Sequence, residues 1–428
     1  MSWFYPEGVY TLLMIGVFAF GAFAWNLPIA VAMALATIVG ALAAGEGIPL
    51  RHLGEGEFGY INTILVIATA MMFMKVVLKT GMLDSMSAWM IRKFRKFPAL
   101  LSLGIMFIIM VPGMITGSST AAVLTTGALV SPVLITLGMS KVRTAAAVSM
   151  GSLLGMIAPP VSIPAMIICA GVDIPYVGFA IPLLICTIPL AVLFALTMIY
   201  PYIRRFSDEK ALEEQLVKMS KHPLNFRLIL PVVVLVALFA ADQFLAGYWP
   251  GMGMPLIFLL SAVSGLFSGT KWNVVDTATE AVNDALPVLG ILMGVGMFIQ
   301  VMTLIGVQGF VVVSALSLPS WILYAGIAVS MPLFGAVSSF GSASVLGVPF
   351  LLALLKFNSV IVASALSLIA SLGDLMPPTA LAGIFAAQVV GEDNYFKVLK
   401  ICLIPGIILA VWGIAVIVMS GTIAKFIF

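Results

Sequence analysis

Charged side chains are scarce in this sequence. Asp, Glu, Lys and Arg together make up 9% of its 428 residues, whereas 62% are hydrophobic. Gly8 to Gly45, Phe97 to Ser140 and Ala285 to Leu355 contain none of the four. A soluble surface needs far more charge, and about 20 consecutive apolar residues suffice to cross a bilayer. The composition therefore excludes a soluble protein and predicts an all-α polytopic membrane protein.

Residues that carry common catalytic and metal chemistry are also few. The three cysteines, Cys169, Cys186 and Cys402, lie in apolar stretches without metal-like spacing, and the two histidines are far apart. The sequence has no HExxH, GxSxG or Walker motif. We therefore expect neither enzyme activity nor a cofactor. The net charge of +3, with basic residues in short loops, also argues against a nucleic-acid partner.

The apolar runs between charge clusters predict ten membrane spans. Two further apolar regions, 98–140 and 319–355, have Gly, Ser, Thr and Pro at their middles. Each fits a re-entrant hairpin, in which a helix, a polar tip and a returning helix follow one another. Residues 82–96 mix basic residues with Met and Trp and predict an interfacial amphipathic arm. The ten spans are expected at about 8–25, 27–45, 60–80, 144–170, 177–203, 227–247, 253–270, 285–305, 358–390 and 398–422.

The basic residues predict an orientation. They gather at 92–96, 141–143 and 204–227, which should be cytoplasmic by the positive-inside rule. The predicted spans place all three on one side only if 98–140 enters and leaves the membrane by the same face, as a hairpin does. This arrangement puts both chain termini on the periplasmic side of a bacterial inner membrane.

Four short motifs recur in the same order along the chain. NLPIAV matches GMPLIF, LKTGML matches TLIGVQ, GMIAPPVSIPA matches GDLMPPTALAG, and GVDIPYV resembles GEDNYFK, at offsets of 227, 225, 218 and 220 residues. Five predicted crossings separate Pro28 from Pro255, so the second copy should be upside down. An inverted-topology repeat is typical of secondary transporters. We place the first copy at 1–226 (hairpin about 98–140, broken helix 144–170, basic cytoplasmic loop 204–226) and the second at 227–428 (hairpin about 319–355, broken helix 358–390).

Each half has a small polar hairpin tip followed by an apolar helix that Pro–Pro interrupts. Consecutive prolines remove N–H donors and free backbone carbonyls, which a Na⁺ ion and the tip hydroxyls could satisfy. Local hydrogen bonding and close helix packing are the alternative explanation. The first predicted cation site comprises Ser118, Ser119, Thr120, Gly155 and Ala158; the second comprises Ser338, Ser339, Gly341, Ser342, Gly373, Asp374 and Pro377; the expected substrate contacts are Thr125, Thr126, Ser162 and Thr379.

Asp374 is an acidic residue well inside an apolar run, three positions before Pro377. A carboxylate there is costly unless it is paired, protonated or bound to a cation, and we expect it to be ionised and to bind Na⁺. A structural hydrogen bond is the alternative. By contrast, Lys75 and Lys79 are interpreted as snorkelling to the interface, and Glu280 and Asp284 as solvated residues near the start of a span.

The order of these motifs resembles a known family. LPIAV, the amphipathic arm, the GSST tip with TTGALVSP, the AAAVSMGSLLGMIAPP broken helix and GVDIPYV are similar to the large, DctM-type membrane subunit of tripartite ATP-independent periplasmic (TRAP) transporters, within an ion-transporter superfamily of elevator carriers. The similarity covers nearly the whole chain and is most specific from Ile115 to Val177.

The resemblance implies Na⁺-driven uptake of an organic acid across the inner membrane. It also implies two partners, an extracytoplasmic substrate-binding protein and a small four-helix membrane subunit. The second half matches less typically, which leaves a stand-alone Na⁺- or H⁺-coupled organic-anion carrier of the same superfamily as an alternative. A membrane scaffold without transport is a further alternative, but it has no use for duplicated helix breaks that each cost roughly 3 kcal/mol or more.

Overall fold

The computed structural model describes residues 5–204, 206, 209–220, 224–244, 251–270 and 272–427. Every regular element in these residues is a helix. Within the described residues, seven helices are long and apolar enough to cross a membrane, and several shorter apolar helices accompany them. The composition thus gave the correct fold class, an all-α polytopic membrane protein.

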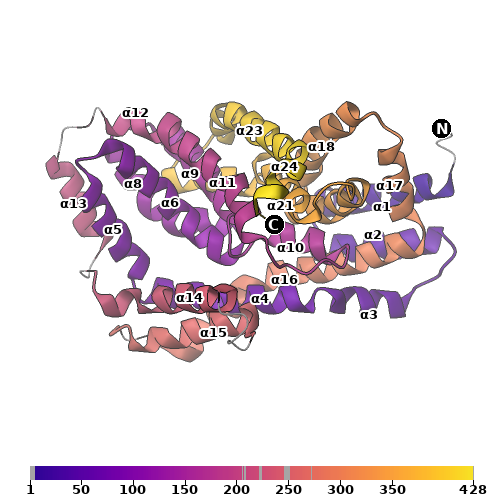
Figure 1. Cartoon of the computed structure of the whole chain (residues 1–428), viewed down its shortest axis with the longest axis horizontal. Helices are drawn as coiled ribbons and strands as arrows, with labels where there is room; N and C mark the ends of the chain where they lie inside the picture. The colour runs from indigo at the N-terminus through magenta and orange to yellow at the C-terminus, as the bar shows by residue number, and fades with distance from the viewer. Residues whose placement is uncertain are drawn as a thin grey trace.

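One side of the molecule is built from long helices that run beside one another (Figure 1). The long-helix layer consists of α2 (Ile29–Ala43), α3 (Leu50–Gly59), α4 (Ile61–Lys79) and α16 (Val274–Leu304), and α16 packs along the other three. Gly56 and Gly296 let α3 and α16 touch, because a Cβ on Gly56 would lie 2.5 Å from the Gly296 carbonyl oxygen. At the edges of the layer are α1 (Pro6–Phe23), α14 (Phe226–Phe244), α15 (Gly253–Ser264), a short 3₁₀ turn (Gly265–Phe267) and α17 (Val307–Leu316).

The first re-entrant hairpin follows the amphipathic arm, α5 (Met82–Phe94). It consists of α6 (Pro98–Thr116), a one-turn α7 (Ser119–Ala122), a π-helical turn (Val123–Gly127) and α8 (Ala128–Thr136). The broken helix is α9 (Lys141–Ile157) and α10 (Ile163–Ala170), which Pro159–Pro160 separates. Proline removes the N–H and clashes with the preceding turn, so the α-helix cannot continue through this pair.

The second half repeats these elements. Its hairpin consists of α18 (Ser320–Gly335), a one-turn α19 (Ser339–Ser342), a π-helical turn (Ala343–Gly347) and α20 (Val348–Ala353). Its broken helix is α21 (Ser359–Ser371), a 3₁₀ turn (Leu372–Leu375) and α22 (Leu381–Val390) around Pro377–Pro378. Both hairpins and both helix breaks are therefore present, as the sequence predicted.

The remaining helices surround the two hairpins. These are α11 (Ala180–Phe194) with a π-helical turn (Ala195–Ile199) and α12 (Tyr200–Ile203), then α13 (Glu209–Met219), α23 (Tyr395–Val418) and α24 (Ser420–Ile427). Helix α13 packs against α5 and α8, where Arg92 and Glu213 form an ion pair at 2.8 Å.

Helix α13 lies inside the predicted basic loop 204–226, so that segment is partly helical. Residues 205, 207–208 and 221–223 of this loop, and the last residues of the span expected at 227–247, lie outside the described residues.

Contacts between the two broken helices show that the halves are inverted. Lys141 Nζ, at the start of α9, donates to the Gly391 carbonyl just after α22 (3.3 Å), and Ser149 Oγ lies 3.4 Å from the Ala382 carbonyl at the start of α22. The two helices therefore run antiparallel. Gly81 and Gly306, paired by the repeat, both have a positive φ (71° and 75°) and both precede a short helix. Glycine adopts this backbone conformation without the steric cost that a Cβ brings.

Candidate functional site

The two hairpin tips have the same local design. Ser118 and Ser338 are N-cap residues whose hydroxyls accept the backbone N–H of Ala121 and Gly341, each at 3.2 Å. Serine is a favoured N-cap because its oxygen satisfies an otherwise unpaired N–H. A π-helical turn follows each tip, an irregularity frequent at functional sites. The next residue in each half, Ser119 or Ser339, is buried.

Glycine pairs hold each hairpin against the break of its own half. A Cβ on Gly113 would lie 2.7 Å from the carbonyl carbon of Gly155, and a Cβ on Gly335 would lie 2.5 Å from the Cα of Gly373. In both halves the first helix of the hairpin therefore contacts, backbone to backbone, the part of the broken helix that precedes Pro–Pro. Gly155 and Gly373, which the sequence placed in cation sites, form these contacts.

Asp374 lies where the two halves meet. It belongs to the 3₁₀ turn before Pro377 and is only 4% exposed. Ser119 of the first hairpin donates a hydrogen bond to its Oδ2, and Ser339 of the second hairpin also interacts with the carboxylate through its hydroxyl. The sequence analysis assigned Ser119 to one cation site and Asp374 to the other. The structure joins them in one cluster.

A cavity of about 530 Å³ opens beside this cluster. One wall belongs to the hairpin tips and to α22, with Phe340, Leu381 and Phe385. The opposite wall belongs to the long-helix layer, with Met71, Met74 and Val288 among others. We call this space the tip cavity. Seven residues predicted as cation or substrate contacts line it: Ser118, Ser119, Thr120, Thr125, Ser338, Ser339 and Asp374.

Several predicted residues lie away from the tip cavity. Thr126 donates to the Ile109 carbonyl (3.3 Å) and Ser342 to the Met331 carbonyl (2.7 Å), so both tie a tip to the first helix of its own hairpin. Thr379 bonds the Ala336 carbonyl at 2.7 Å and ties the second break to its hairpin.

The rest of the predicted set flanks the two helix breaks and the second tip. Ser162 is fully buried beside the first break, and its hydroxyl has no hydrogen-bond partner among the described residues. Ala158 and Gly341 are buried too, whereas Pro377 is exposed.

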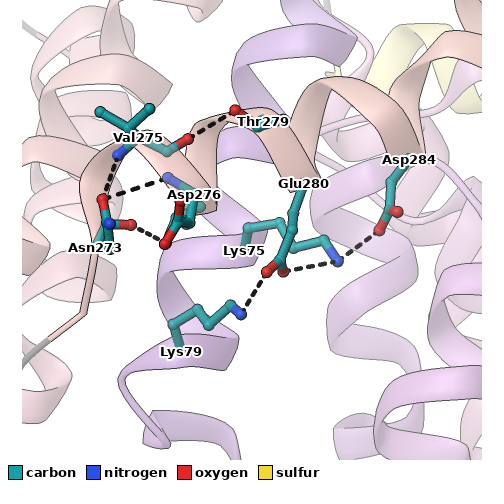
Figure 2. A network of polar contacts seen from close by, with 9 residues as sticks. Lys75, Lys79, Asn273, Val275, Asp276, Thr279, Glu280 and Asp284 are labelled. Carbon is teal, nitrogen blue, oxygen red and sulfur yellow. Dashed lines mark hydrogen bonds and ion pairs between the residues drawn. The ribbon is translucent and has the colours of Figure 1, made fainter.

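The long-helix layer contributes a charged network that the sequence analysis did not place at the site. Lys75 Nζ lies 2.6 Å from Asp284 Oδ2 and 3.9 Å from Glu280 Oε2, and Lys79 Nζ lies 2.7 Å from Glu280 Oε1. Figure 2 shows the lysines of α4 pointing toward the carboxylates of α16. Lys75 and Asp284 also line the tip cavity.

The interpretation of these four residues as snorkelling or solvated agrees with the exposure of Lys79, Glu280 and Asp284 (41%, 43% and 54%) but missed their pairing across two helices. Helix α16 starts at Val274, eleven residues before the expected span at 285, so Glu280 and Asp284 are helical residues that face α4. Lys75 and Lys79 are four residues apart, and so are Glu280 and Asp284. Two such i, i+4 pairs of opposite charge on two helices are the sequence pattern that could have predicted the network.

The oxygen atoms at the tip cavity belong to the Asp374 and Asp284 carboxylates, the hydroxyls of the two tips and the amide of Asn283. Asp284 is already paired with Lys75. No group of three or more His, Cys, Asp or Glu side chains suited to a metal occurs in the described part of the chain. Oxygen ligands with a single unpaired carboxylate, Asp374, suit a hard, weakly held cation better than a transition metal.

Comparisons with solved structures agree with this fold. MtrF of Neisseria gonorrhoeae, whose structure is described as illuminating a class of antimetabolite efflux pumps, is similar with a TM-score of 0.64 at 15% identity, covering 97% of each chain. The YdaH transporter of Alcanivorax borkumensis, described as having an unusual topology, is similar with a TM-score of 0.59 at 16% identity, covering 98% of each chain. At these identities the likeness concerns the fold.

Sequence comparison identifies the family. No curated protein matches the chain in sequence. The family described as "Tripartite ATP-independent periplasmic transporter, DctM component" matches residues 15–424, nearly the whole chain. The structure adds two inverted hairpins that meet at a buried carboxylate. On the match over residues 15–424, the chain belongs to the DctM component family of tripartite ATP-independent periplasmic transporters.

Proposed function

We propose that this chain is the subunit that carries an organic acid anion across the inner membrane, driven by Na⁺ entering with it. The observation that supports this most is the contact of Asp374 with Ser119 and Ser339, because it gathers a carboxylate and hydroxyls from both halves at one buried point. A carboxylate within an apolar bundle is expensive without a counter-charge. A Na⁺ ion held by Asp374 and the tip hydroxyls would supply it.

The anion would bind in the tip cavity beside the ion. The helices that begin at the tips, Ser119–Thr136 and Ser339–Ala353, direct their N-terminal ends toward it. Helix N-termini carry partial positive charge and favour a carboxylate. Coupling then follows, because the cation neutralises Asp374 and removes the repulsion that an anion would meet there.

Movement between the two faces would be of the elevator type. The hairpins and broken helices contact one another closely through their glycine pairs. The tip cavity separates part of this group from the long-helix layer, and contacts such as the Tyr60 hydroxyl with the Ile167 carbonyl (3.0 Å) join the rest. We propose that the first group moves as a body against the layer. The partners would be a small four-helix membrane subunit and an extracytoplasmic substrate-binding protein, which the word tripartite in the family description supports.

Uptake into proteoliposomes tests this function. The full chain, purified with the small subunit, is reconstituted and offered radiolabelled carboxylates with and without an inward Na⁺ gradient and a binding protein. We expect accumulation only when both are present. Accumulation without the binding protein would instead indicate a stand-alone carrier, and accumulation driven by a proton gradient alone would contradict Na⁺ coupling.

A further inference from the structure

Among the described residues that line the tip cavity, Lys75 is the one cationic side chain. Its side chain is 21% exposed and lines the cavity, and its nearest partner is Asp284 at 2.6 Å. Lys79, one helical turn further along α4, is bound to Glu280 and does not line the cavity. The two neighbouring lysines therefore differ in what they can reach.

The repeat shows that a lysine is not needed to hold these two helices together. The 225-residue offset that relates Gly81 to Gly306 also relates Lys75 to Gln300 and Glu55 to Glu280. In the mirrored contact Gln300 hydrogen-bonds Glu55, so a neutral amide takes the place that Lys75 has beside Glu280. At that end Glu55 is also paired with Arg51 of its own helix at 2.7 Å. In the two mirrored contacts, therefore, a lysine reaches across to a carboxylate of the other helix only at the end that borders the tip cavity.

The charges around the cavity explain what Lys75 could bind. With Lys75 paired to Asp284, the lining retains one uncompensated carboxylate, Asp374. Once a cation neutralises Asp374, an organic anion in the cavity can offer Lys75 a carboxylate equivalent to that of Asp284. Because one acceptor replaces another, the ammonium group stays paired throughout. The displaced Asp284, whose side chain is 54% exposed, is then solvated by water.

We propose that Lys75 binds the carboxylate of the transported anion and that Asp284 is its competitor, which holds Lys75 when the cavity has no anion. This inference rests on the proposed function, since it names the scaffold residue that recognises the substrate class. Lys75 lies at the end of α4 next to the basic arm α5, so under the predicted orientation the exchange occurs at the cytoplasmic opening.

The test is a binding titration of the purified full chain. Its thermal unfolding midpoint is followed in saturating Na⁺ with acetate, succinate and citrate as probes. For the probe that stabilises the wild type most, Lys75→Gln should weaken the apparent affinity about tenfold, the loss of one charge-assisted hydrogen bond. Lys79→Gln, the matched control, should change it less than about twofold. Asp284→Asn should tighten binding, because it removes the competitor.

The opposite effects expected of Lys75→Gln and Asp284→Asn on affinity distinguish binding of the anion by Lys75 from a purely structural ion pair between α4 and α16. If Lys75→Gln and Asp284→Asn weaken binding alike, or Lys75→Gln behaves as Lys79→Gln does, the proposal is overturned while the proposed function stands. If none of the three probes stabilises the wild type in Na⁺, carboxylate transport itself fails, and this inference with it. Should Lys75→Gln not fold, Lys75→Arg, which keeps the charge, must retain affinity, and Asp284→Asn still decides the sign.

Discussion

Asp374 is the side chain of the polar site whose burial costs the most desolvation free energy. It is buried in an apolar bundle and its described contacts are hydroxyls, which are neutral. Hydroxyl hydrogen bonds stabilise a carboxylate but do not cancel its charge. A cation at this position would satisfy both the charge and the oxygen atoms of the two tips.

Asp374→Asn is therefore predicted to abolish most Na⁺-dependent uptake while leaving the protein folded. The amide keeps the shape and can still accept the Ser119 hydrogen bond, but it has no charge to attract Na⁺. Initial uptake rates measured across a series of Na⁺ concentrations would show the loss.

Asp276→Asn is the matched control, because Asp276 is an exposed carboxylate at the start of α16, away from the tip cavity. It should transport as the wild type does. If Asp374→Asn also retained the wild-type rate and Na⁺ dependence, Asp374 would have a structural role only.

At the scale of elements, each hairpin is fixed to a broken helix by a glycine pair that leaves no space for a side chain. Gly373 has the Gly335 Cα 2.5 Å from where its Cβ would be, and Gly155 has the Met110 carbonyl oxygen at 2.5 Å. The neighbouring atoms are backbone, so they cannot move aside as a flexible side chain could. The same contact in both halves explains why glycine stands at both positions.

Gly373→Ala is predicted to lower the free energy of unfolding by about 1–3 kcal/mol, since the added methyl group forces α18 and the break apart. Thermal unfolding of the purified protein in detergent measures this. Gly326→Ala in α18 is the control, because no atom lies within 4 Å of its Cβ position. Equal unfolding midpoints for the two variants would contradict the close contact.

The whole molecule is organised by the inversion of its halves. The antiparallel packing of α9 and α22 brings Lys141 beside Gly391, although these residues start and end helices in different halves. The loops after the two broken helices, which contain Asp173 and Asp393, should consequently lie on opposite faces of the membrane.

Cysteine labelling in cells tests this topology. Asp173 and Asp393 are both exposed, and the three native cysteines are buried, so the wild type serves as the unlabelled control. Asp173→Cys should react with a membrane-impermeant maleimide in intact cells, whereas Asp393→Cys should react only after permeabilisation, because the positive-inside rule places the Lys141 end in the cytoplasm. Labelling of both variants from the same side would disprove the inversion.

The sequence by itself determined the elements that depend on local chemistry. Apolar runs without charge set the helices, Pro159–Pro160 and Pro377–Pro378 set the breaks, and clusters of Gly, Ser and Thr set the hairpin tips. These features require only neighbouring residues, because backbone geometry and burial of an apolar stretch are decided within a few turns. The recurring motifs also revealed the repeat.

Only the tertiary structure decided which of these pieces meet. Ser119 and Asp374 are 255 residues apart, and Lys79 and Glu280 are 201 apart, so no local pattern relates them. The tips were expected to face the break of their own half, but inversion of the halves brings Ser119 to the other half's carboxylate. The charged network was missed because a lysine near the end of a span has the same sequence signature whether it reaches solvent or a carboxylate on a packed helix. That choice depends on the register of α4 against α16, which is fixed by side chains along the full length of both helices.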